Sequence, residues 1–262
     1  MIRIKTARQI DGIRESCRLL AEVLDVLEES VAEGMTTADL DALARREITD
    51  RGGRPAFLGY QGFPGALCTS VNDEVIHGIP GERALTGGDI VSIDCGIEYR
   101  GYFSDSAITV PVGSISPELQ RLMDVTRESL EQGIAAATAG RRINDISRAI
   151  YTVLSEQGYG VVRPYCGHGV GLEIHEDPQI PNYVGRGPNP RLKPGMVIAI
   201  EPMVNLGGDE VEVLDDDWTV VTEDRSISAH FEHTVAIFRD HTEVLTRRRS
   251  ESVHSEAEVP VP

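Results

Sequence analysis

The 262-residue sequence lacks several features that would each point to a particular class of protein. It has no Cys-x-x-Cys pair, because its four cysteines are widely spaced, and this excludes a zinc finger or a thioredoxin-like motif. No apolar run approaches the roughly 20 residues of a membrane span, and there is no apolar leader. The 25 Lys and Arg against 42 Asp and Glu give a net charge of −17, which repels phosphate backbones. We therefore expect a cytoplasmic protein that binds neither nucleic acid nor a membrane.

The apolar residues that are present follow the spacing of an α+β protein. Helical periodicity and capping residues predict four helices. Extended apolar runs bounded by turn residues predict strands between and after them. The expected helices run from Thr6 to about Gly34, from Thr36 to about Gly52, from Ser116 to about Ile134, and from about Asn144 to Gln157. The expected strands cover 67–76, 89–97 and 102–110, and the chain from there to about Leu245, outside the helices, is strand and loop.

The order of these elements contains an internal repeat. Gly34 to Gly52 spans 18 residues, and so does Gly140 to Gly158. The run Gly-Asp-Ile-Val-Ser-Ile-Asp at 88–94 then aligns with Gly-Met-Val-Ile-Ala-Ile-Glu at 195–201, and the offset stays at 106 or 107 residues throughout. Matched spacings over this length predict two related α/β units rather than a chance coincidence of helix-stopping glycines.

The repeat also predicts how the domain is divided. We expect one domain at 1–246 with halves at about 6–112 and 113–246, antiparallel strands inside and helices on the outer face. A site is expected between the halves, where a shared cleft would form.

The segment 247–262 has three arginines followed by Ser, Glu, Val and Pro without periodicity. It is expected to be a disordered tail with Arg247–Arg249 in solvent.

Four acidic residues occupy unusual places in this pattern. Asp94 and Glu201 are repeat mates, and each ends an apolar strand run. Asp105 and Glu232 follow on the next predicted strand of each half. Any one of them alone could be a solvated or ion-paired carboxylate. Together they predict a cluster of buried carboxylates, which repel one another unless metal ions neutralise them.

Three histidines extend the candidate site. His168 stands in Gly-His-Gly-Val-Gly and His175 follows seven residues later, while His77 lies in Asn-Asp-Glu-Val-Ile-His-Gly-Ile-Pro. Each alone could be a structural histidine, and the seven-residue spacing does not force a shared face. An imidazole beside carboxylates favours Mn, Fe, Co or Zn over Mg or Ca.

Seven segments of the sequence carry a further signal: 72–80, 88–94, 101–105, 167–171, 174–176, 200–203 and 231–235. Together they resemble a type I methionine aminopeptidase, in the superfamily of metallo-aminopeptidases and prolidases. The resemblance covers about Thr6 to Leu245 and implies the pita-bread fold. The stretch between His175 and Glu201 has no room for the helical insertion of type II relatives, and no zinc-binding extension precedes the core. Both features favour the short bacterial form of type I.

The resemblance implies a role for each candidate residue. The implied ligands of two divalent ions (Co, Mn, Fe(II) or Zn) are Asp94, Asp105, His168, Glu201 and Glu232. Asp105 and Glu232 would bridge the ions, and Glu201 would also relay the proton of the attacking water. His77 and His175 would contact the substrate backbone as further catalytic groups, with His175 at the developing oxyanion.

The resemblance also implies the substrate. It would be the N-terminal methionine of nascent polypeptides with a small second residue, removed co-translationally by a monomer. Ribosome association is compatible with such a substrate, although the net charge lends it no support. The methionine pocket would be lined by Tyr60, Phe63, Cys68 and Trp218, with Phe57 and Ile174 nearby.

Two alternatives stay open on the sequence. A prolidase or proline aminopeptidase uses the same metal ligands but usually carries an extra N-terminal domain, for which we expect no room here. A binding protein of the same fold that has lost catalysis typically lacks the ligands, whereas this sequence holds all five. Comparing the cleavage of Met-Ala-Ser with that of X-Pro peptides distinguishes the first alternative from a methionine aminopeptidase. The metal content of the protein distinguishes the second.

Overall fold

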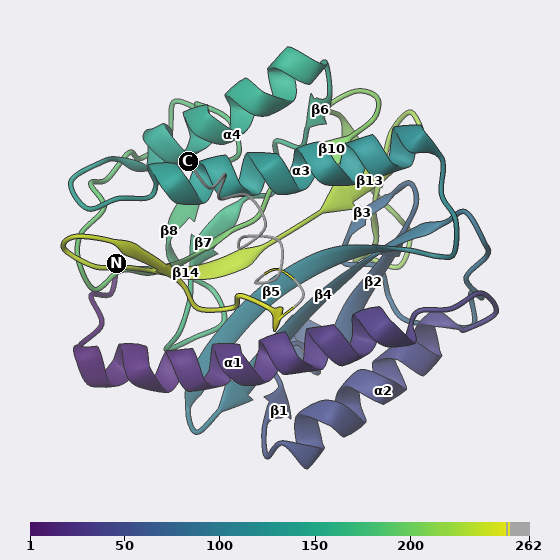
Figure 1. Ribbon diagram of the computed structural model, residues 1–262, viewed down its shortest axis with the longest axis horizontal. Helices are drawn as coiled ribbons and strands as arrows, with labels where there is room; N and C mark the ends of the chain where they lie inside the picture. The colour runs from purple at the N-terminus through teal and green to yellow at the C-terminus, as the bar shows by residue number, and fades with distance from the viewer. Residues whose placement is uncertain (250, 252–262) are drawn as a thin grey trace, which may run out of the picture.

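Four long helices flank the strands of the computed structural model, which describes residues 1–249 and 251 (Figure 1). In this view α1 and α2 lie below the strands, and α3 and α4 lie above them. The helices are α1 Ala7–Ser30, α2 Thr37–Asp50, α3 Pro117–Ala136 and α4 Ile143–Gln157. A 3-10 turn, η1 Tyr60–Gly62, lies in the glycine-rich loop after α2.

The strands form two main antiparallel sheets and two small ones. In the first main sheet the order is β1-β4-β2, with β5 also paired to β4, and in the second it is β15-β14-β9-β7-β8. The small sheets are β13-β10-β6 and β11-β12-β3. Together with the helices, this is the predicted α+β arrangement of two pseudo-symmetric units. The strands are β1 Arg54–Pro55, β2 Leu67–Val71, β3 Glu74–Ile76, β4 Ile90–Tyr99, β5 Tyr102–Pro111, β6 Gly160–Val161, β7 Gly167–Gly169, β8 Glu176–Ile180, β9 Val197–Ile200, β10 Met203–Asn205, β11 Val211–Val213, β12 Val220–Thr222, β13 Ser228–His230, β14 His233–Ile237 and β15 Thr242–Val244.

The helix ends follow the capping signals in the sequence. Thr6 and Thr36 each form a capping box, with Gln9 and Asp39 respectively, and the Ser116 hydroxyl accepts from the Leu119 amide. The helix after Thr6 ends at Ser30, short of the predicted glycine. At the end of α4, Gly158 adopts the left-handed conformation that closes many helices.

The predicted strand over 67–76 is wrong, because it is two strands separated by a turn at Asn72. Asn72 has a φ of 58°, a left-handed conformation that asparagine tolerates better than most residues. Its side chain secures the turn, since Nδ2 donates to Asp89 Oδ1 (2.8 Å) and Oδ1 accepts from the Ile90 amide (3.1 Å). The break directs β3 away from β2 towards β12, and the chain then continues into His77.

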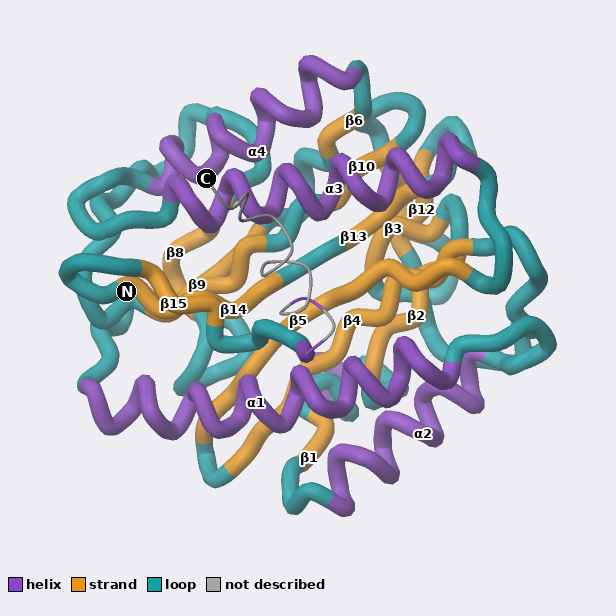
Figure 2. The backbone as a smooth tube through the Cα atoms, viewed as in Figure 1, coloured by secondary structure: helices purple, strands orange, loops and turns teal. Residues whose placement is uncertain are grey.

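The two main sheets meet where β5 lies beside β14 (Figure 2). The Thr234 hydroxyl donates to the Asp105 carbonyl (2.7 Å), and the Ser106 hydroxyl donates to the Glu232 carbonyl (2.7 Å). The Glu232 amide completes the junction by donating to the Ala107 carbonyl (2.9 Å). Two of the predicted metal ligands, Asp105 and Glu232, therefore lie in the seam between the sheets.

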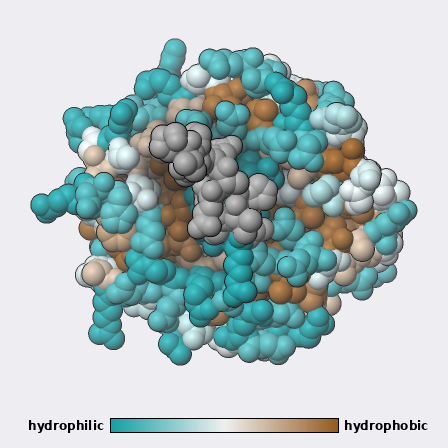
Figure 3. Space-filling model, in the orientation of Figure 1, coloured by the Kyte–Doolittle hydropathy of each residue, from teal (hydrophilic) through white to brown (hydrophobic). Residues whose placement is uncertain are grey.

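The apolar core fills the space between the helices and the strands. One continuous cluster includes Leu24 and Leu27 of α1, Ile150 of α4 and Ile198 of β9, all with no exposed surface. Burial of this kind contributes about 25 cal/mol per Å² of apolar surface removed from water. The core thus fixes the strands that carry the candidate site. Polar side chains cover most of the face seen in Figure 3, as the acidic composition predicts.

The first part of the predicted tail is tied to the body of the protein. Arg248 is only 4% exposed and forms ion pairs with Glu28 of α1 and with Glu251, while Arg247 pairs with Glu131 at 2.6 Å. The prediction that Arg247–Arg249 lie free in solvent is therefore wrong for Arg248, whose charge needs partners because it is buried. Residue 250 and residues 252–262 lie outside the described residues.

No helix in the described part of the chain is both long enough and apolar enough to cross a membrane.

Candidate metal centre

Two carboxylates of the candidate site come from the first main sheet. Asp105 on β5 lies opposite Gly96 on β4, and Asp94 lies two residues before Gly96 on the same strand. Residues two apart on a strand share a face, so Asp94 and Asp105 are diagonal neighbours on one side of the sheet. The side chain of Cys68, opposite Asp94 on β2, lies on this face as well.

The other three candidate ligands come from the second half of the chain. His168 is the middle residue of β7, Glu201 directly follows β9, and Glu232 lies between β13 and β14. His168 Nε2 lies 3.7 Å from Asp105 Oδ2 and 3.5 Å from Glu201 Oε1. The structure thus brings together donors that are up to 138 residues apart in the sequence (94 to 232).

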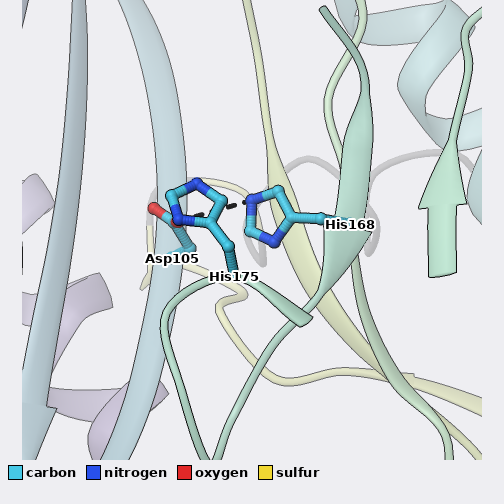
Figure 4. A group of neighbouring side chains, drawn as sticks. All are labelled: Asp105, His168 and His175. Carbon is cyan, nitrogen blue, oxygen red and sulfur yellow. Dashed lines mark ion pairs between the residues drawn. The ribbon is translucent and has the colours of Figure 1, made fainter. Parts of the chain in front are cut away.

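The five predicted ligands form two overlapping groups. In one group, donor atoms of Asp94, Asp105 and Glu232 lie within 4.8 Å of one another, and in the other those of His168, Glu201 and Glu232 do. Glu232 belongs to both groups, which is the position of a bridging carboxylate. A third group joins Asp105 and His168 with His175. Figure 4 shows these three side chains gathered together, with a dashed line for the ion pair between Asp105 and His168.

The carboxylates of this cluster fit a divalent cation, because they lack other partners. Asp94 Oδ1, Asp105 Oδ1 and Glu232 Oε1 are buried and accept no hydrogen bond. Burial, and then repulsion from neighbouring carboxylates, holds the pKa of Asp105 and of Glu232 well above the usual range. Burial also raises the pKa of Asp94 to about 7. Buried oxygens of this kind are satisfied by protons or by cations.

Glu201 differs from the other three carboxylates in its charge state. Burial would raise its pKa, but the nearby imidazoles of His230 and His168 outweigh burial and lower it. Its Oε2 lies 3.6 Å from His230 Nε2, and the Asn182 side chain donates to the Glu201 carbonyl (2.9 Å). Glu201 is therefore the carboxylate most ready to remain ionised and accept a proton.

His230 is a site residue that our sequence analysis missed. It is 1% exposed, and neither ring nitrogen has a hydrogen-bond partner. A signal for it does exist in the sequence: it precedes Glu232 by two residues, and residues two apart in extended chain point the same way. His230 lies against Glu201 as a result.

His175 lies over the cluster in the neutral state. Its ring centroid is 4.3 Å from that of His168, and its Nδ1 lies 3.1 Å from the Tyr60 hydroxyl. Burial lowers the pKa of His175 to about 4, so at neutral pH it keeps one N–H that can donate a hydrogen bond.

His77 lies beside the candidate ligands, in the wall of the same cavity. Its backbone has a φ of 59°, and its ring meets the Tyr165 ring edge-on at 5.5 Å and lies 6.3 Å from the Trp218 ring. Burial lowers its pKa below the usual value for histidine. His77 belongs to none of the groups of donor atoms found in the described residues, which separates it from the five candidate ligands.

A cavity of about 290 Å³ has the cluster at one end and apolar walls at the other. Phe63 and Cys68 are 3% and 5% exposed, and Trp218 meets Phe63 edge-on with ring centroids 5.0 Å apart. Burial, and then Asp94, raises the pKa of the Cys68 thiol far above neutrality, so it is a wall and not a nucleophile. The cavity is lined by Phe57, Tyr60, Gln61, Phe63, Cys68, His77, Asp94, Asp105, His168, His175, Glu201, Trp218 and Glu232.

A wider cleft of about 570 Å³ meets this cavity at the metal candidates. It shares with it the side chains of His77, His168, His175 and Glu201. Its other walls come from the start of the chain, from the segment before β7 and from the turn into β8. These residues are Met1, Arg3, Ile76, Pro164, Tyr165, Cys166, Gly167, Glu173, Glu176, Asp177 and Gln179. The cluster therefore lies where a small apolar pocket joins an open groove.

The fold and the donor set together define a metallopeptidase, and sequence comparison identifies the family. The profile of metallopeptidase family M24 matches residues 11–238. The chain therefore belongs to metallopeptidase family M24, within its methionine aminopeptidases. A methionine aminopeptidase of Treponema pallidum is 56% identical over 247 residues, which are 94% of this chain and 96% of that protein.

Comparison with solved structures agrees with this assignment. The crystal structure of a methionine aminopeptidase from Rickettsia prowazekii matches with a TM-score of 0.92 and 38% identity, over 94% of this chain and 100% of that chain. A prolidase from Pyrococcus furiosus matches with a TM-score of 0.78 and 26% identity, over 94% of this chain but 66% of that chain. The predicted pita-bread fold and the predicted family are confirmed.

Proposed function

We propose that this chain removes the N-terminal methionine from nascent polypeptides with a small second residue, co-translationally, at a dinuclear metal centre. The observation that carries the proposal is the position of the five donors at the end of a narrow apolar cavity. An apolar pocket beside the donors, walled by Phe63, Cys68 and Trp218, would accept the side chain of one N-terminal residue, which favours an exopeptidase. The names of the similar proteins support methionine as that side chain.

The two groups of donors suit two ions. Asp94, Asp105 and Glu232 would hold one, and His168, Glu201 and Glu232 the other, with Asp105 close enough to His168 to bridge as well. When bound, such ions polarise the scissile carbonyl and lower the pKa of water. Carboxylates with one imidazole suit Co, Mn, Fe(II) or Zn.

The protein's own side chains would supply the proton transfers and the orientation. Glu201, kept ionised beside His168 and His230, would accept a proton from the attacking water. Neutral His175 would donate a hydrogen bond to the developing oxyanion. His77, which lines both the pocket and the cleft, would hold the peptide backbone. The carboxylates would attract the free α-amino group of the substrate.

Hydrolysis of a peptide panel, with chelation and metal add-back, tests the proposed function. We expect cleavage of Met-Ala-Ser, little cleavage of a Met peptide with a bulky second residue, and none of X-Pro dipeptides. Chelation should abolish turnover, and Mn²⁺ or Co²⁺ should restore it. Preferential X-Pro cleavage would favour the prolidase alternative. Only trace metal in the purified protein, with no hydrolysis after add-back, would favour the binding-protein alternative.

Replacing His77 by Ala should impair turnover without removing metal. His77 lies at the junction of pocket and cleft but belongs to none of the donor groups of the described residues. We expect kcat/KM for Met-Ala-Ser to fall by about 10- to 100-fold, the usual cost of misplacing a bound substrate. Metal content after dialysis should equal that of the wild type. Loss of metal would instead make His77 a ligand.

The proposal also includes the setting in which the enzyme works. We propose a monomer in the cytoplasm, with one catalytic domain at 1–246 built from halves at about 6–112 and 113–246. A single chain supplies all five donors, so the site needs no second copy. Action on nascent chains places it near the ribosome, and co-sedimentation with translating ribosomes would test association.

A further inference from the structure

A buried ion pair joins the start of the chain to the turn that carries His175. Lys5 Nζ lies 2.8 Å from Glu176 Oε2, and each side chain is only 1% exposed. Removing two charges from water is costly and is compensated only when the geometry is good and the remaining polar atoms are also satisfied. The pair is 171 residues apart in the sequence, so it is a tertiary contact and not a local one.

The second oxygen of Glu176 closes the turn itself. Glu176 Oε1 accepts from the Leu172 amide (2.8 Å) and from the Glu173 amide (3.2 Å). The same carboxylate therefore ties residues 172–173 to the residue that directly follows His175. Without it, two amides at the head of the turn would lose their acceptor.

Lys5 is itself held firmly on the other side. Its backbone amide donates to the Gly195 carbonyl (2.7 Å), and the Gly195 amide donates to the Ile237 carbonyl of β14 (2.8 Å). Its side chain passes close to Gly171, where an added Cβ would lie 3.6 Å from Lys5 Cε and only 2.4 Å from Ile13 Cδ1. The turn thus rests on Lys5 and on α1.

We propose that Lys5 and Glu176 are positioning residues that hold the His175 imidazole over the metal centre. Glu176 closes the turn, and Lys5 keeps the Glu176 carboxylate correctly oriented for that contact. The proposal rests on the proposed function, since it assigns the pair a part in hydrolysis through His175. Lys5 lines neither the cavity nor the cleft, and Glu176 lines only the outer cleft, so the pair would act on the donor cavity through His175.

The exposed pair Arg100–Glu15 provides a control away from the site. It joins α1 to the turn between β4 and β5 at 3.5 Å, and its side chains are 70% and 57% exposed. Exposed pairs contribute little, so Arg100→Gln should leave kcat within about twofold of the wild type. Lys5→Met should lower kcat by about 10- to 100-fold, because it leaves a buried carboxylate without its partner and displaces His175. KM should change little, since the oxyanion contact forms in the transition state.

Two double variants separate the turn contact from the loss of charge, and neither leaves a buried charge unpaired. In Lys5→Met/Glu176→Gln the amide oxygen can still accept from Leu172 and Glu173, so kcat should stay within about threefold of wild type. In Lys5→Met/Glu176→Ala the acceptor is gone, and kcat should fall by about 10- to 100-fold. Amide hydrogen exchange over 170–177 should speed up only in the variant with Ala. Metal content should be unchanged in both.

A His175→Ala background shows whether the effect passes through His175. Lys5→Met should add less than about threefold to the loss caused by His175→Ala, since coupled residues are not additive. The proposal is overturned if Lys5→Met lowers kcat equally in that background, or if both double variants behave alike. If the wild type fails to cleave Met-Ala-Ser, the proposed function fails, whereas the exchange comparison still decides whether Glu176 closes the turn.

Discussion

Glu201→Gln is expected to lower kcat for Met-Ala-Ser by on the order of 10²- to 10⁴-fold, the usual contribution of a general base. His230 and His168 hold the pKa of Glu201 down despite its burial, so the carboxylate is ionised at neutral pH. Gln has nearly the same shape and keeps an oxygen at the position of Oε1, but it cannot take a proton. The change therefore removes the proposed base while disturbing the cavity little.

Metal content and a surface variant make this result interpretable. An amide oxygen can still face a cation, so the dialysed variant should retain at least one divalent ion per chain, as measured by elemental analysis. Glu128→Gln on the exposed face of α3 makes the same chemical change away from the site and should leave kcat unaltered. A Glu201→Gln protein with full metal content and kcat within about tenfold of wild type would rule out Glu201 as the base.

The sequence could predict the candidate ligands because each obeys a local rule. Asp94 and Glu201 end apolar runs that can only be buried strands, and the internal repeat aligns them. Glycines beside His168 let two backbones approach it, since a Cβ on Gly167 would lie 2.4 Å from the Ala199 carbonyl oxygen. Strand periodicity then fixes which side chains share a face. The resemblance to a known family added the roles that these rules cannot supply.

The features that escaped prediction all depend on contacts between distant segments. Lys5 resembles any surface lysine until Glu176 is placed beside it, and Arg248 resembles a tail residue until α1 supplies Glu28. The strand over 67–76 divides because the Asn72 side chain bonds to residues 17 and 18 positions later, which no strand propensity can reveal. Buried charge pairs and turn-forming side chains are thus the least predictable parts of this protein.

Divalent metal should stabilise the protein more strongly as the pH rises from about 5.5 to about 8. In the metal-free protein, burial raises the pKa of Asp94 to about 7, and holds those of Asp105 and Glu232 well above their usual values. Protonation of these groups stabilises the folded, metal-free protein. This stabilisation is complete below their ordinary pKa near 4, and it is lost as the pH rises through their raised pKa values in the folded state. Metal must displace those protons in order to bind. The stabilisation that metal provides therefore grows by up to about 1.4 kcal/mol per pH unit for each displaced proton.

Other groups around the site titrate in the opposite sense, so the comparison must be between metal-loaded and metal-free protein at each pH. Burial lowers the pKa of His77 and His233, and lowers that of His175 to about 4. Neutral histidines in the folded state stabilise it increasingly as the pH rises through about 6.5. Most of this contribution is common to both forms and cancels in the difference.

The increase in Tm on adding saturating MnCl₂ measures this advantage directly. We expect the increase to be larger at about pH 8 than at about pH 5.5, by on the order of 5 °C for a chain of this size. Asp105→Asn, which removes a carboxylate shared by two of the donor groups, should abolish most of the increase. Asp240→Asn, at an exposed acid 85% accessible at its side chain, should preserve it. A metal-induced increase that is constant or shrinks with rising pH would show that these carboxylates are not the groups that metal deprotonates.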